Sequence, residues 1–204
     1  MPKRHFHIFN LSLIICEAGD LWLNATTISR GKNHSMDISI LSTGGTIEKT
    51  YDETDGSMRN VKSVLDDILL RLRLFNLNIR HTNLMSKDSL HLTDEDRGII
   101  LAAVRYAMGQ ADAIIVVHGT DTLSTTGELL VRELPDITKP VILTGAMRPY
   151  EFRDTDAIQN LTESLLACRL VSPGVYVAMH NRVLQFPGVT KDRKRLTFVK
   201  DAED

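Results

Sequence analysis

Three short stretches of this sequence combine threonine, glycine and charged residues in a way that could bind or attack a small molecule. They are residues 42–46 (Ser-Thr-Gly-Gly-Thr), 118–122 (His-Gly-Thr-Asp-Thr) and 144–149 (Thr-Gly-Ala-Met-Arg-Pro). Glycine lets the backbone turn sharply and leaves amide N–H groups facing a ligand, while hydroxyl and carboxylate groups add directional hydrogen bonds. Each stretch alone could equally be a structural connector, because threonine hydroxyls often cap helices.

An apolar run precedes each stretch and is expected to form a β-strand. The predicted strands cover residues 38–42, 78–82, 113–118, 140–144 and 174–179. They alternate with amphipathic segments, a pattern typical of repeated βα units and a parallel sheet. Because ligands bind outside the carboxyl ends of the strands in such a sheet, the three stretches are expected to meet at one edge.

Four amphipathic segments are expected to form helices. The second opens with Thr93 and Asp96, a capping-box-like pair, and the third and fourth cover residues 123–133 and 155–170. The first has its apolar residues on one face, at Val61, Val64, Leu65, Ile68 and Leu72. Right-handed crossovers place such helices on both faces of the sheet. The predicted fold class is α/β, an open, mainly parallel, doubly wound sheet in a Rossmann-like or flavodoxin-like three-layer sandwich, as a single domain.

Composition narrows the class of protein. Hydrophobic residues make up 43% and charged residues 25% of 204 residues, which is typical of one soluble globular domain. Lys and Arg number 24 against 26 Asp and Glu, so no positive excess favours a nucleic-acid partner. Cys16 and Cys168 stand in no metal-ligand or paired spacing, which favours a reducing compartment and a cytoplasmic location.

Residues 1–35 differ from the rest of the chain. A basic start precedes an apolar run at residues 8–16, which resembles a secretory signal but is interrupted by Asn10 and Ser12 and has no clean cleavage site. The run is also shorter than the roughly 20 apolar residues of a membrane span. We therefore expect an N-terminal extension over residues 1–35, disordered or arising from an upstream start codon, and one domain over residues 36–204.

The order and spacing of the motifs resemble the L-asparaginase family, bacterial-type amidohydrolases with a threonine nucleophile. Residues 43–47 and 118–122 are similar to the two signature motifs of that family. Three further stretches agree in order, namely residues 87–96, 143–149 and 189–191. The resemblance extends from Ile38 to about Thr197. It implies an amidohydrolase that converts L-asparagine to L-aspartate and ammonia without a cofactor or a metal ion.

The resemblance also implies a role for each matched catalytic residue. Thr46 would attack the side-chain amide carbon and form an acyl-enzyme. Thr120, Asp121 and Lys191 would form a second group that moves protons, because a threonine hydroxyl is a poor nucleophile until a base accepts its proton. Asp121 would also help to hold the α-ammonium of the substrate. Without the motif, Lys191 would read as an ordinary surface lysine.

The substrate-binding residues follow from the same resemblance. Asp88 and Ser89 would contact the α-amino and α-carboxylate groups. Tyr51 is the nearby candidate for the tyrosine that a mobile loop offers to the nucleophile, although it could equally pack on the sheet edge. Leu90 stands where larger members commonly have a polar residue, so the fit to asparagine is expected to differ.

The longer members carry a second, C-terminal domain that contributes an acidic group to the site across a dimer, whereas this chain resembles the N-terminal domain only. A homo-oligomer is therefore expected, with a small-molecule amide as the only other partner and no nucleic acid or membrane. The alternative function is a catalytically weak or inactive domain that binds an amino acid as a sensor. Dinucleotide-binding and metal-hydrolase alternatives are disfavoured, because the sequence has neither a G-x-G-x-x-G nor an H-E-x-x-H motif.

The break in pattern at Met36 generates a first prediction. A chain that starts at Met36 should be as soluble as the full chain and should melt at about the same temperature. Thermal unfolding followed by circular dichroism checks this, and loss of folding in the shortened chain would show that the extension packs on the domain.

Overall fold

The computed structural model of this protein describes residues 35–60 and 63–200. The predicted N-terminal extension lies outside the described residues except for Ser35, so its proposed character stays a prediction. Val61 of the first predicted helix also lies outside them.

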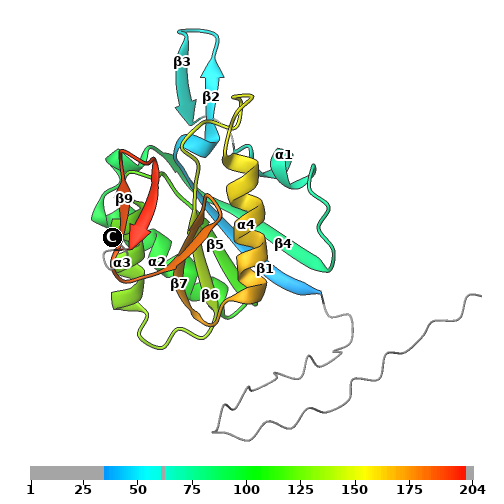
Figure 1. The fold of residues 1–204 in the computed structure, drawn as a ribbon, viewed down its shortest axis with the longest axis vertical. Coiled ribbons are helices and arrows are strands. Elements are labelled where there is room, and N and C mark those ends of the chain that lie inside the picture. The colour runs from blue at the N-terminus through cyan, green and yellow to red at the C-terminus, as the bar shows by residue number, and fades with distance from the viewer. Residues whose placement is uncertain (1–34, 61–62, 201–204) are drawn as a thin grey trace, which may run out of the picture. The chain divides into compact units, whose positions relative to one another are not determined.

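A six-stranded sheet with the order β4-β1-β5-β6-β7-β8 forms the centre of the domain (Figure 1). Its five parallel strands are those expected from the sequence, namely β1 (Met36–Gly44), β4 (Leu77–Lys87), β5 (Ala113–Val117), β6 (Pro140–Thr144) and β7 (Gly174–Met179). A strand that the sequence did not predict, β8 (Arg182–Gln185), adds antiparallel to β7 at one edge. In chain order the parallel strands run 2-1-3-4-5, the flavodoxin-like arrangement, so the predicted fold class is confirmed.

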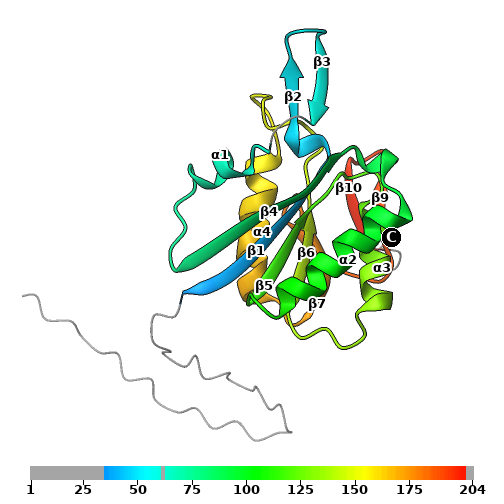
Figure 2. The same ribbon diagram turned by 180° about the vertical axis from the view of Figure 1, so that it is seen from behind.

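Helices cover both faces of this sheet (Figures 1 and 2). The helices α2 (Asp94–Met108) and α3 (Leu123–Glu133) pack on one face, and α1 (Leu65–Leu69) and α4 (Ala157–Leu170) pack on the other. The expected capping box is present at the start of α2, where Thr93 and Asp96 bond to each other's backbone N–H groups.

The first helix is shorter than the apolar spacing suggested. It ends at Leu69, after which the N–H groups of Arg71 and Leu72 bond three residues back, and the chain turns at Asn76 (φ 54°) into β4. Leu72 still packs against the core. The periodic apolar spacing therefore identified the buried side of this segment correctly but not the length of its helix.

The central strands show why the sheet is so well defined by its sequence. All five residues of β5 and all five of β6 are buried, as expected for parallel strands covered on both sides. Side chains alternate along β5, so that Ile115 and Val117 face α4 while Ile114 and Val116 face α2 and α3.

Two antiparallel hairpins complete the domain, and neither was expected. The first, β2 (Lys49–Asp52) with β3 (Ser57–Asn60), follows the turn after β1 and projects beyond the sheet (Figure 1). The second is β9 (Val189–Asp192) with β10 (Thr197–Lys200). Within the described part of the chain, no helix has the length and apolar character needed to cross a bilayer.

Two glycines in helices give a matched stability prediction. A Cβ at Gly127 in α3 would overlap the ring of Phe186, whereas a Cβ at Gly98 in α2 would have no atom within 4 Å. Gly98→Ala should raise the free energy of unfolding by about 0.5–1 kcal/mol, because alanine restricts the unfolded chain and favours helix.

Gly127→Ala should instead lower the free energy of unfolding by about 1–3 kcal/mol, the usual cost of overpacking. Urea denaturation of both variants measures the difference. Stabilisation of similar size in both would show that the Phe186 ring moves aside freely.

Candidate active site

The turns that follow β1, β4 and β5 touch one another at the carboxyl edge of the sheet. A Cβ added to Gly45 (φ 84°) would lie 2.5 Å from Gly119 Cα, and one added to Gly119 would lie 2.6 Å from Ser89 Oγ. Only glycine permits these approaches. The site therefore lies at the point between β1 and β5 where the strand order reverses, the usual place for ligands in this architecture.

The first motif is fixed by backbone and side-chain hydrogen bonds. Thr43 Oγ1 donates to the carbonyl of Val117 at 3.1 Å, which ties this turn to the end of β5. The Gly44 N–H donates to Glu48 Oε2 at 2.9 Å and closes the turn across Thr46. Thr46 is the first residue of the 3₁₀ helix η1 (Thr46–Glu48) and is partly exposed, so its hydroxyl is available at the edge.

The structure brings together the second predicted group. Lys191 Nζ on β9 lies 2.8 Å from Thr120 Oγ1 and 3.0 Å from Asp121 Oδ1. Phe198 stands opposite Lys191 in the hairpin register and is buried in the core, which fixes β9 against the domain. Arg193, which the sequence gave no reason to single out, also lies 3.2 Å from Asp121 Oδ1.

The predicted substrate-binding residues lie on η2 (Ser89–His91), directly after β4. Ser89 is buried, and its carbonyl accepts a hydrogen bond from Thr122 Oγ1 at 2.8 Å, which joins this segment to the second motif. Asp88 caps η2 by accepting the Leu90 N–H at 3.1 Å. Its other carboxylate oxygen lies 2.8 Å from Lys49 Nζ. This hydrogen bond from Lys49 is the main reason that the pKa of Asp88 is lowered.

Tyr51 lies apart from this group. It stands on β2, its side chain is 56% exposed, and its N–H donates to Glu151 at 2.7 Å. Its phenol oxygen lies along the hairpin, 3.5 Å from where a Cβ of Gly56 would be. The proposed role of Tyr51 at the nucleophile therefore stays a prediction.

Two buried ionisable residues hold the motifs in place. The His118 ring bonds through Nδ1 to the Gly119 carbonyl at 2.7 Å and through Nε2 to Thr126 Oγ1 at 2.9 Å. Burial lowers the pKa of His118 to about 4, so the ring is neutral. Burial also raises the pKa of Glu48, which braces the first motif.

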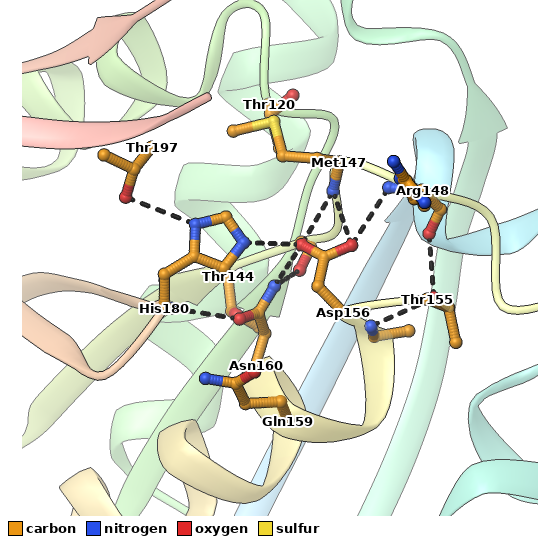
Figure 3. A network of polar contacts seen from close by, with 12 residues as sticks. Thr120, Thr144, Met147, Arg148, Thr155, Asp156, Gln159, Asn160, His180 and Thr197 are labelled. Carbon is orange, nitrogen blue, oxygen red and sulfur yellow. Dashed lines mark hydrogen bonds and ion pairs between the residues drawn. The ribbon is translucent and has the colours of Figure 1, made fainter. Parts of the chain in front are cut away.

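Asp156 organises the third stretch (Figure 3). Its carboxylate accepts the N–H groups of Met147 and Arg148 at 2.9 and 3.0 Å and lies 2.8 Å from His180 Nε2. The other ring nitrogen of His180 lies 3.2 Å from Thr197 Oγ1 on β10. The network thus connects the turn after β6 to the hairpin that carries Lys191.

Sequence reasoning missed Lys49, Glu48 and Arg193. None of them stands in a motif, and the partners of Lys49 and Arg193 lie far away in the chain, so no local spacing pointed to them. Within residues 35–60 and 63–200, no three histidine, cysteine, aspartate or glutamate side chains are grouped so as to hold a metal ion.

An open α/β sheet with a threonine, lysine and aspartate group at its carboxyl edge matches a known class of hydrolase domain. Residues 37–197 match the family model described as "Asparaginase, N-terminal". The chain therefore belongs to the asparaginase family.

Individual relatives agree with this assignment. The chain is 34% identical over 161 residues to the L-asparaginase of Thermococcus kodakarensis, covering 76% of this chain and 48% of that protein. The solved structure of the thermostable L-asparaginase from that organism superposes with a TM-score of 0.71 at 31% identity, over 81% of this chain and 51% of that one. The chain spans about half the length of these relatives.

Other relatives have different names. One component of the glutamyl-tRNA(Gln) amidotransferase of Pyrococcus horikoshii is 31% identical over 179 residues, covering 84% of this chain and 41% of that protein. A probable periplasmic L-asparaginase of Haemophilus influenzae is 29% identical over 194 residues, covering 90% and 50%. The substrate and the location of this chain do not follow from family membership, so the expected cytoplasmic location stays a prediction.

The buried imidazole of His118 generates a pH prediction. Protons bind His118 in the unfolded chain near pH 6.5 but in the folded chain only near pH 4, so acid favours unfolding between these values. This single group should lower the free energy of unfolding by about 3 kcal/mol by pH 4.

The measurement is the free energy of unfolding between pH 7 and 4 for the native chain, His118→Asn and His91→Asn. His91 is exposed and serves as the control. The decline should be shallower only in His118→Asn, and equal slopes in all three chains would contradict the assignment.

Proposed function

We propose that this chain is an amidohydrolase that releases ammonia from a small linear carboxamide such as L-asparagine, with Thr46 as nucleophile. The observation that supports this most directly is the position of Lys191 Nζ, within 3.0 Å of both Thr120 Oγ1 and Asp121 Oδ1. A lysine held between a threonine hydroxyl and a carboxylate, on a segment beyond the second motif, is the arrangement that the family resemblance implies.

The proposed reaction has two halves. Thr46 Oγ1 attacks the amide carbon, and backbone N–H groups near Thr120 stabilise the negative oxygen that forms. Collapse of this intermediate breaks the carbon–nitrogen bond and releases ammonia, which leaves an ester on Thr46. Water then attacks the ester, gives the carboxylate product and restores the Thr46 hydroxyl.

The Thr120, Asp121 and Lys191 group would move the protons in both halves. Lys191 must be neutral to accept a proton, and Asp121 fixes its position. Because these groups lie on separate turns, the contact of Gly45 with Gly119 is what sets the nucleophile beside them.

Substitutions in this site should separate catalysis from binding. Thr46→Ala should abolish ammonia release, because no acyl-enzyme can form. Lys191→Met and Thr120→Val should each reduce kcat by about 10²–10⁴-fold, the usual contribution of a proton-transfer group. Ammonia release from asparagine and related amides is the measurement.

Two matched variants serve as controls. Thr162→Ala removes an exposed hydroxyl on α4, and Lys194→Met removes an exposed lysine close to Lys191 in the chain. Both should keep native turnover. Unchanged turnover in Thr46→Ala would contradict the mechanism, whereas aspartate binding without turnover in the native chain would support the sensor function instead.

A further inference from the structure

Both carboxylates expected to hold a substrate ammonium are already paired with cations of this chain. Lys49 Nζ lies 2.8 Å from Asp88 Oδ2, and the Leu90 N–H donates to Asp88 Oδ1. Lys191 Nζ and Arg193 both lie within 3.2 Å of Asp121 Oδ1. An incoming ammonium group would have to displace one of these cations.

Lys49 is held in this position by the local fold. It directly follows η1, which the bond between Gly44 and Glu48 braces, and it is the first residue of β2, where it pairs with Asn60. The side chains of Lys49 and Asp88 are 26% and 28% exposed, so water screens the pair only in part. The ammonium of Lys49 therefore stays close to Asp88 even when that pair opens.

The balance of charge around the site is positive. The cations Lys49, Lys191 and Arg193 face two carboxylates, those of Asp88 and Asp121. A second ammonium group placed beside Asp88 would be repelled by Lys49, whereas a carboxylate would be attracted to it. Leu90, 64% exposed, adds an apolar surface beside Asp88 in place of a polar contact.

We propose that Lys49 fills the subsite for a substrate α-ammonium, so that the site prefers monoamides of dicarboxylic acids that lack this group over asparagine. Succinamic acid, which is asparagine without its amino group, is the simplest member of this class. Its hydrolysis consumes one water and gives succinate and ammonia. The inference rests on the proposed carboxamide hydrolysis for turnover, but its binding preference can be measured without turnover.

The first experiment compares kcat/KM for succinamic acid and asparagine in the native chain and in Lys49→Met. The native chain should favour succinamic acid by about tenfold or more, and Lys49→Met should raise the value for asparagine about tenfold and lower it for succinamic acid. Lys139→Met is the matched control, since Lys139 pairs with Asp112, at the opposite end of β5, at 3.7 Å. It should change neither value.

The second experiment measures binding of succinate and aspartate by calorimetry, which does not require turnover. Succinate should bind the native chain about tenfold more tightly than aspartate, and the order should reverse in Lys49→Met. Lys49→Gln, checked by circular dichroism, repeats the test with a polar side chain.

The outcomes separate the two proposals. Binding that follows this pattern without ammonia release would refute the proposed hydrolase but support the role of Lys49. A native preference for asparagine and aspartate, an unchanged ratio in both Lys49 variants, or no binding of either acid would overturn the role of Lys49.

Discussion

The turns after β1 and β5 touch through their backbones, and every proposed chemical group of the site depends on that contact. Gly45 and Gly119 approach so closely that a single added Cβ would overlap the opposite turn, and Ser89 closes on Gly119 from the third side. This packing sets Thr46 beside the second motif. A larger residue at either glycine would separate the nucleophile from the groups that are proposed to serve it.

Buried polar groups hold these turns where apolar packing cannot. His118 occupies both ring nitrogens within its own strand end and helix, and Asp156 gathers backbone N–H groups of the turn after β6. Buried polar atoms are costly unless they are bonded, so these satisfied networks define one geometry for each turn. The network around Asp156 extends through His180 to β10, which links the turn after β6 with the hairpin of Lys191.

Charge is the second property that the fold gives to this site. Asp88 and Asp121 are placed at the edge where a ligand would bind, but each is paired with basic side chains from the hairpins. Such pairs cost little to rearrange where water reaches them, so they influence which ligand is preferred more than they influence stability. The family fold therefore leaves room for different substrates according to which residues the two hairpins bring.

The sequence by itself determined the parallel strands, the faces of the helices and the three strand-end turns. Continuous apolar runs such as Ile114–Val117 and the glycines of the turns are local signals that survive in any correct fold. Motif resemblance added Thr46, Thr120, Asp121 and Lys191 as a set. Only the tertiary structure decided that Lys191 lies against Thr120 and that Lys49 lies against Asp88. These contacts join segments 71 and 39 residues apart, and they depend on strand order and on short, exposed hairpins that carry no periodic apolar pattern.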